Sequence, residues 1–292
     1  MQRTIVTHDG KFHADDCFAV AALLLFLKGG ATVARTRERE RIAAADFALD
    51  VGGEYEPARN RFDHHQKKGA GGRANKIPYA AFGLVWKHFG EQIAGGKAVS
   101  EMIDKKLVQP LDAHDNGAEL FSETHFSVYP YELSDAIRAL NPSWRESQEE
   151  MDTRFLDAVS FAQKIIAREI EMAQAEAEGA RKVTEAYRAA QDKRLILLNE
   201  DLPSKDALAR VPEPLYCVHP QDAQWFVECV RDNPHLFVNR KDLPESWAGL
   251  CDEELAKRTG VPDAVFCHRN RFMAVAKSRE GATVLAHLAL ES

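Results

Sequence analysis

Four short clusters of aspartate and histidine hold the residues of this chain whose types are best suited to chemistry. In the densest cluster, Asp63 stands directly before His64 and His65. The other clusters lie at residues 8–16, 50–53 and 112–117. Imidazole nitrogens and carboxylate oxygens are ligands for hard or borderline divalent metals. The pattern therefore predicts a metal site assembled from four loops.

These clusters supply more ligands than one metal ion can use. The candidate ligands are His8, His13, Asp15, Asp50, Asp63, His64 and one or both of Asp112 and Asp115. The set contains no thiolate, which favours manganese or magnesium over structural zinc. Two ions about 3.5 to 4 Å apart are typical of hydrolytic sites that steady both the attacking and the leaving oxygen. We therefore expect two divalent cations, Mn²⁺ first and Mg²⁺ as the alternative, with a hydroxide held between them as the nucleophile.

Two residues of the densest cluster, Asp63 and His65, are expected to be catalytic. Asp63 is a candidate to bridge or ligate the two ions. His65 is not needed to complete a coordination shell, so it can face a scissile phosphoryl group and stabilise its negative charge. The alternative role for His65 is to orient a neighbouring metal ligand.

The elements around the first clusters predict how they are brought together. Short β-branched or apolar runs at 4–6, 31–34 and 47–51 read as strands, and helices are expected at 14–26, 78–86 and 99–111. Alternation of strands and helices favours a parallel sheet with helices on both faces. Ligands of such sheets bind beyond the carboxyl ends of the strands. His8, Asp50 and Asp63 all fall at or just after an expected strand end, so the topology itself would gather them.

The second half of the chain predicts a connector and a smaller domain. Residues 146–192 have apolar positions spaced by three and four, as in a long amphipathic helix, with a break expected near Gly179. The strands and helices expected after it, at 194–198, 204–209, 215–218, 225–230, 245–258, 264–268 and 272–276, indicate an α+β domain. We therefore predict domains at 1–145 and 193–292 joined by a helical connector at 146–192. The long helix also allows a homodimer.

Composition and charge limit the classes of function. The chain has 292 residues, 45% of them hydrophobic and 28% charged, as in an ordinary globular protein. Its formal net charge of −7 argues mildly against broad binding to nucleic acid, although bound cations can reverse the sign locally. The longest apolar stretch, 18–27, is shorter than the roughly 20 residues that span a bilayer, so no membrane contact is expected. Five cysteines without a CxxC pair suggest reduced thiols and a cytoplasmic protein.

Several motifs together resemble a known family. They are THDGKFHADD at 7–16, DHHQ at 63–66, IPYA at 77–80, FGLVW at 82–86, DNG at 115–117, NEDLPS at 199–204 and LPESW at 243–247. The chain resembles the DHH phosphoesterase superfamily, and more closely the exonuclease family named for melanocyte proliferating gene one, over essentially its whole length. The resemblance implies an α/β fold with a DHH-type N-terminal domain and a DHH-associated-like C-terminal domain. It also implies a metal-dependent 3′-to-5′ exonuclease acting on single-stranded RNA or short oligonucleotides.

The first cluster and the C-terminal domain depart from the superfamily pattern. The superfamily usually has His-x3-Asp-x-Asp, whereas here His13 takes the place of the first aspartate. In place of a glycine-rich substrate loop, this chain has basic residues that could hold a nucleotide phosphate: His268, Arg269, Arg271, Lys277 and Arg279. Two alternatives remain. The same metal site could serve a phosphatase or pyrophosphatase acting on a small phosphorylated compound, or the chain could be a noncatalytic metal-dependent binding protein.

Overall fold

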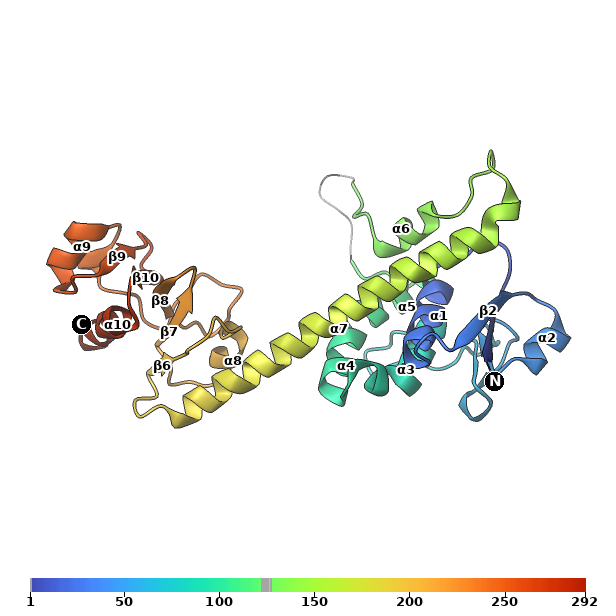
Figure 1. Ribbon diagram of the computed structural model, residues 1–292, viewed down its shortest axis with the longest axis horizontal. Coiled ribbons are helices and arrows are strands. Elements are labelled where there is room, and N and C mark those ends of the chain that lie inside the picture. Colours follow the sequence, from blue (N-terminus) through green and yellow to red (C-terminus); the bar gives the residue numbers. More distant parts are fainter. Residues whose placement is uncertain (1, 122–125, 127) are drawn as a thin grey trace. The chain divides into compact units, whose positions relative to one another are not determined.

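The computed structural model describes residues 2–121, 126 and 128–292. The chain forms two compact units, Met1–Gln174 and Ala175–Ser292 (Figure 1). The boundary falls inside the long helix α7 (Met151–Ala189), so the residues expected to form a connector, 146–192, are shared between the two units. No helix in the described part of the chain is both long enough and apolar enough to cross a membrane.

A mixed sheet in the order β2-β1-β3-β5-β4 forms the centre of the first unit. Its strands are β1 (Arg3–Thr7), β2 (Ala31–Arg35), β3 (Phe47–Leu49), β4 (Tyr55–Glu56) and β5 (Arg61–Phe62). β1, β2, β3 and β5 run parallel, and only the edge strand β4 is antiparallel to its neighbour. The expected parallel sheet is therefore confirmed.

Helices cover both faces of this sheet, as predicted. On one face α1 (Ala14–Phe26) packs against α3 (Ala81–Ala94), and Phe89 of α3 contacts Phe47 and Phe62 with ring centroids 6.3 and 5.7 Å apart. On the other face Ile42 of α2 (Arg39–Ala44) packs against a buried cluster that includes Val6. α1 is buried on nearly all sides from Ala14 to Leu23, which explains its unbroken apolar sequence.

Three helices differ from their expected form. α3 begins at Ala81, so Pro78 precedes the helix and does not lie in its first turn. The expected helix at 99–111 is a continuous run of α4 (Lys97–Ile103), a π-helical turn (Asp104–Val108) and α5 (Gln109–Asp115). Pro110 explains the π turn, because proline cannot donate to the preceding turn and its ring needs extra room there. The expected helix at 245–258 is a 3₁₀ turn (Glu245–Trp247) followed by α9 (Asp252–Thr259), with Gly249 at a φ of +74° between them.

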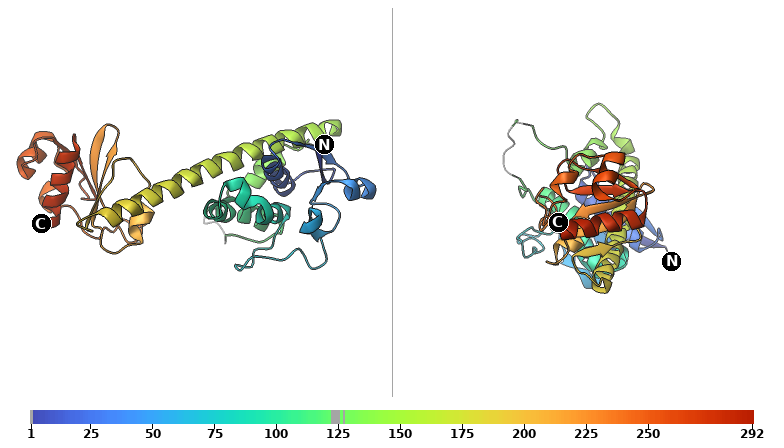
Figure 2. Two further views of the ribbon diagram at one scale, coloured as in Figure 1. Left: turned by 60° about the horizontal axis from the view of Figure 1, so that its bottom comes forward. Right: turned by 90° about the vertical axis from the view of Figure 1, so that its left-hand side faces the viewer.

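α7 is unbroken at Gly179, contrary to the expected interruption (Figure 2). A Cβ on this glycine would lie 2.7 Å from Cγ of Pro203. Gly179 therefore allows close packing of the loop before α8 against the helix and does not mark a break.

The second unit is an α+β domain, as predicted. Its sheet has the order β6-β7-β8-β10-β9, with β6 parallel to β7 and the other neighbours antiparallel. The strands are β6 (Leu195–Leu197), β7 (Tyr216–Gln221), β8 (Gln224–Cys229), β9 (Ala264–Cys267) and β10 (Met273–Ala276). α10 (Arg279–Glu291) and α9 contribute to one hydrophobic cluster, and the end of α7 packs with α8 (Lys205–Ala209) in another.

Candidate metal centre

Three parallel strands end directly at predicted ligands. β1 ends one residue before His8, β3 one residue before Asp50, and β5 one residue before Asp63. Asp50 has a φ of +54°, a left-handed conformation that is uncommon for residues other than glycine, asparagine and aspartate. Such conformations often occur at functional sites because the surrounding structure must hold them.

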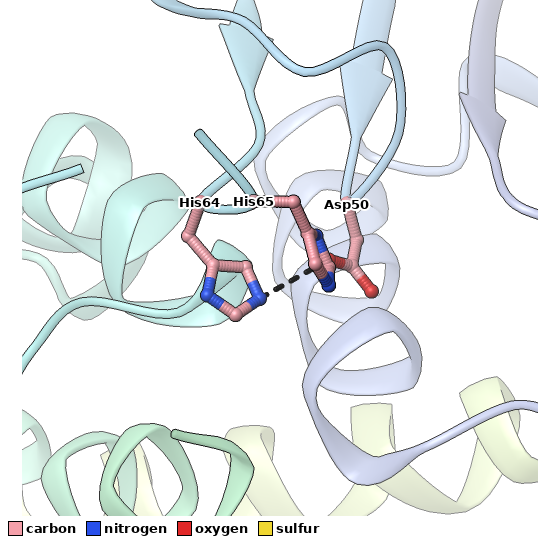
Figure 3. A group of neighbouring side chains, drawn as sticks. All are labelled: Asp50, His64 and His65. Atoms are coloured by element: carbon pink, nitrogen blue, oxygen red, sulfur yellow. Dashed lines mark ion pairs between the residues drawn. The ribbon is translucent and has the colours of Figure 1, made fainter. Parts of the chain in front are cut away.

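His64 is the centre of the cluster. Its Nε2 atom lies 3.3 Å from Oδ1 of Asp50, 3.2 Å from Oδ2 of Asp115 and 3.9 Å from Oδ2 of Asp15. Figure 3 shows His64, His65 and Asp50 side by side, with the contact between His64 and Asp50. Two sets of potential ligand atoms result, each with all members within 4.8 Å of one another: Asp50, His64 and His65, and Asp15, His64 and Asp115.

His8 joins the cluster from the other side of Asp50. Its Nε2 atom is 3.4 Å from Oδ2 of Asp50 and 3.3 Å from Oδ2 of Asp16. Its Nδ1 atom lies 2.9 Å from the backbone oxygen of Asp9, which favours a proton on Nδ1. That tautomer leaves the Nε2 lone pair for a metal.

Three buried polar atoms of the cluster make no hydrogen bond to any described residue. Oδ1 of Asp50, Oδ2 of Asp16 and Nε2 of His64 are buried and have no hydrogen-bond partner among the described residues. Buried polar groups in folded proteins are nearly always paired, so these three need an explanation. Carboxylate oxygens beside imidazole nitrogens match the donor set of a divalent cation such as Mn²⁺ or Mg²⁺. The residues present therefore fit a metal.

Charge in the cluster leads to the same conclusion. Burial raises the pKa of Asp15, and the nearby carboxylates of Asp115 and Asp50 raise it further. Burial also acts to raise the pKa of Asp50, but the close contacts of its carboxylate with the imidazoles of His64 and His65 outweigh it and hold that pKa well below its usual range. Burial lowers the pKa of His64, yet its close contacts with the carboxylates of Asp115 and Asp50 raise it to about 11. Because the carboxylates crowd one another, a bound cation would neutralise charge that the histidines balance only in part.

Helix α3 holds one of the carboxylates in place. The oxygens of Asp15 accept hydrogen bonds from the backbone N–H groups of Ala81 and Phe82, at 2.9 and 2.7 Å. These N–H groups belong to the first turn of the helix, where backbone donors lack partners within the helix. Asp15 therefore caps α3 and presents itself to His64 at the same time.

The carboxylate of Asp63 accepts hydrogen bonds from nearby loop residues. Its carboxylate accepts from the backbone N–H of Gly53 at 2.6 Å and of His65 at 2.9 Å, and lies 2.8 Å from Nδ1 of His65. It belongs to neither of the two potential ligand sets. In this structure Asp63 fixes the loop and the ring of His65, whose side chain is 62% exposed.

Asp112 and Asp115 lie on the same helix but have different surroundings. Asp112 is fully buried and accepts from the N–H of Gly83 at 2.9 Å and from Arg73 at 2.7 Å. Burial raises its pKa to about 7 despite Arg73. Asp115 instead approaches His64. Of the two aspartates left open by the sequence, Asp115 is thus the one that faces His64.

The loop that carries His13 is anchored by a residue that the sequence did not single out. The Asn141 amide accepts from the N–H of Phe12 at 3.0 Å and donates to its backbone oxygen at 2.9 Å. The ring of His13 lies 5.9 Å from that of His8.

His13 lines two cavities, of about 680 and 250 Å³, and Asp50, Asp63 and His65 also line the larger one. The cluster is therefore open to a substrate.

The predicted basic residues of the second unit lie around the turn between β9 and β10 and at the start of α10. Arg271 pairs with Asp242 at 2.9 Å, and the Arg279 guanidinium lies 5.7 Å from the centroid of the Trp225 ring. Nδ1 of His268 accepts from the backbone N–H of Asn270. Arg269 and Lys277 are exposed.

Sequence reasoning missed Asp16 and Arg73. The sequence does contain an indication for Asp16, because this residue adjoins the predicted ligand Asp15. An acid in the first turn of α1 was already explained by its favourable interaction with the helix dipole, so no metal role was predicted for it. Arg73 lies in a glycine-rich stretch and has no such signal. It reaches Asp112 and Asp104 only because the fold brings its loop to α5 and the π turn.

The family model MYG1_exonuc, described as an uncharacterised protein family (UPF0160), matches residues 4–290. The chain belongs to this family. The predicted membership is thereby confirmed, and the MYG1_exonuc match includes every cluster described above.

Relatives in the MYG1_exonuc family come from distant organisms. The chain is 31% identical over 320 residues to proteins named MYG1 exonuclease from Rattus norvegicus and Homo sapiens, covering 98% of this chain and 84% and 85% of theirs. It is 31% identical over 300 residues to the MYG1 protein of Chlamydia muridarum, covering 99% of this chain and 97% of that protein.

Solved structures of RecJ are also similar to this chain. RecJ of Thermus thermophilus in complex with Mg²⁺ has a TM-score of 0.31 and 13% identity, covering all of this chain and 50% of that one. Exonuclease RecJ bound to manganese has a TM-score of 0.26 and 13% identity, covering 99% and 90%.

Proposed function

We propose that this protein is a metal-dependent phosphodiesterase that removes nucleotides from the 3′ end of single-stranded RNA or short oligonucleotides. The observation that carries the proposal is the shared position of His64 between Asp50 and Asp115, beside buried atoms without partners among the described residues. The relatives named MYG1 exonuclease support the nuclease class.

The metal ligands proposed are those of the four clusters. His8, Asp16 and Asp50 would hold one divalent cation. Asp15, His64 and Asp115 would hold the other. His13 and Asp63 would lie beside the two cations, and Asp112 would support the site without binding a cation directly. When bound, two such cations, Mn²⁺ first and Mg²⁺ as the alternative, neutralise phosphoryl charge and lower the pKa of the attacking water.

His65 is proposed to contact the scissile phosphoryl group. Because its Nδ1 atom lies against Asp63 and Asp50, Nε2 is the nitrogen left to face a substrate. A hydrogen bond from Nε2 to a phosphoryl oxygen would strengthen as negative charge develops there. Asp63 fixes the ring for that role. Lys11 and Arg37 line the same cavity and add positive charge to it.

The basic residues of the second unit are proposed to bind substrate phosphates. Arg269 and Lys277 are exposed and so remain available, whereas Arg271 would have to exchange its contact with Asp242 for a phosphate. Arg279 lies over Trp225 and so combines charge with an aromatic face, and the His268 ring lies beside that of Phe272. Basic side chains interleaved with aromatic rings suit a single-stranded nucleic acid.

Product analysis on defined single strands tests this function. RNA and DNA labelled at the 5′ end are incubated with purified protein and Mn²⁺, and products are resolved with time. We expect a ladder that shortens from the 3′ end on RNA and its loss in His64→Ala, with Lys257→Ala, on the exposed face of α9, as the active control. Full-length substrate that remains intact would refute the exonuclease.

The acidic net charge favours one alternative. A chain of charge −7 is less suited to a long polyanion than to a small phosphorylated compound, so a phosphatase or pyrophosphatase using the same metal ligands is the second candidate. Release of phosphate from pyrophosphate or mononucleotides, with intact RNA in the same assay, would select it.

A further inference from the structure

A cavity of about 290 Å³ opens in the Ala175–Ser292 unit, well away in sequence from the metal ligands. Apolar side chains and two thiols, one buried (Cys217) and one half-buried (Cys229), line part of it, together with Leu208 and Val230. Charged and aromatic residues line the rest: Lys205, Glu228, Arg231, Phe237 and Phe272. Ligand pockets commonly measure about 300 to 1,000 Å³, so this one suits a small ligand and not a long chain.

The aromatic part of the lining is exposed and stacked. Phe237 is 87% exposed, far more than a large apolar side chain without a partner usually is. The Arg231 guanidinium lies 4.9 Å from the centroid of the Phe237 ring and 5.6 Å from that of Phe272. Hydrogen bonds to Asn239 and to the backbone oxygen of Leu236 hold it there. The Phe237 ring and the Arg231 guanidinium therefore provide flat surfaces at the cavity on which a planar ligand can stack.

The charged part has hydrogen-bonding capacity left over. Glu228 lies 3.7 Å from Nζ of Lys205 and 3.6 Å from Nε2 of His219, both longer than a normal hydrogen bond. Its side chain is 20% exposed, and Nε2 of the buried His219 has no hydrogen-bond partner among the described residues. Lys205 is 71% exposed, so its ammonium is free to meet an anion. The Glu228 carboxylate therefore lies near Lys205 and His219, in a cavity whose lining also includes aromatic rings.

We propose that this cavity binds a nucleotide. The base stacks on the Phe237 ring, Glu228 accepts a hydrogen bond from an N–H of the base, and Lys205 and Arg231 contact the phosphate. Stacking on aromatic rings beside cationic side chains is the general way in which proteins hold unpaired nucleotides. This inference rests on the proposed function, since it names a subsite for one nucleotide of the substrate or product.

Binding of AMP and GMP to the full-length chain, measured by calorimetry in EDTA, tests the subsite without hydrolysis. We expect saturable binding of at least one of them, weakened about fivefold or more by Phe237→Ala through the loss of stacking. Val238→Ala is the matched control, because Val238 is 71% exposed next to Phe237 but does not line the cavity. Phe237 is so exposed that its replacement should leave the fold intact, which circular dichroism checks.

A second pair of variants separates base from phosphate. Lys205→Ala should weaken AMP or GMP but leave the corresponding nucleoside unchanged, and Lys257→Ala, on the exposed face of α9, should alter neither. Absence of saturable nucleotide binding, or equal affinity in wild type and Phe237→Ala, would overturn the proposal. A tryptophan- or phenylalanine-containing peptide that binds in place of nucleotides would overturn it too.

Failure of the nucleotide subsite and failure of the proposed exonuclease function give different results. Loss of nucleotide binding in Phe237→Ala together with inactivity of the wild type on RNA would keep the subsite and refute the exonuclease. RNA trimming at the same rate in wild type and Phe237→Ala, without nucleotide binding, would keep the exonuclease and refute the subsite.

Discussion

Replacing Gly83 with alanine should destabilise the first unit by displacing Asp112. An added Cβ would lie 2.6 Å from Cγ of Asp112, and still closer to one of its oxygens. Asp112 is fully buried and pairs with Arg73, and separating a buried charge pair costs about 3 to 5 kcal/mol. Because Arg73 keeps its second partner, Asp104, we take the lower value of about 3 kcal/mol. The helix gains about 1 kcal/mol from the loss of a glycine, so the expected net loss is about 2 kcal/mol.

Urea unfolding followed by tryptophan fluorescence, to which the buried Trp86 of α3 contributes, measures this change. A double-mutant cycle with Asp112→Ala isolates the cause, because the clash disappears when the carboxylate is absent. We expect the loss caused by Gly83→Ala to shrink or change sign in the Asp112→Ala background. A stability gain of about 1 kcal/mol from Gly83→Ala in the wild-type background, the ordinary helix effect, would refute the close approach of α3 and Asp112.

Three further predictions concern the site itself. Asp50→Asn keeps a residue that tolerates a positive φ but removes the charge, so Mn²⁺ affinity measured by calorimetry should fall at least about tenfold; unchanged affinity would exclude Asp50 as a ligand. His65→Ala should lower kcat on RNA about 100-fold or more while Mn²⁺ affinity is retained, and a parallel loss of metal would make His65 a ligand. Arg271→Ala should raise KM while metal binding stays intact. If KM equals that of the control variant Lys257→Ala, Arg271 does not bind substrate and only pairs with Asp242.

The positions of the candidate ligands at the strand ends were predictable in part because they depend on local pattern and on one rule of topology. His8 and Asp50 each follow a short run of mainly apolar residues, whereas Asp63 follows Arg61 and Phe62; parallel strands bring their carboxyl ends to one edge of the sheet. The fold class of both units followed in the same way from the order of strands and helices. Family motifs added the expected activity.

The rest depends on contacts between distant residues. α3 starts at Ala81 because the Asp15 carboxylate, far back in the sequence, caps it there. Which of Asp112 and Asp115 faces His64 depends on the rotation of α5 about its axis. Gly83 leaves room for the Asp112 carboxylate and donates a hydrogen bond to it, and Arg73 pairs with it, so Asp112 points away from His64. A glycine such as Gly179 looks like a helix break in the sequence, and only the packing of Pro203 explains it. None of these contacts leaves a periodic signal.

We propose that the four clusters form one centre for two divalent cations. Anomalous diffraction from crystals grown with Mn²⁺ tests it most directly, because it locates each ion and its ligands. We expect two manganese peaks, one beside Asp15, His64 and Asp115 and the other beside His8 and Asp50. A single peak, or manganese bound away from both ligand sets, would contradict a two-cation centre.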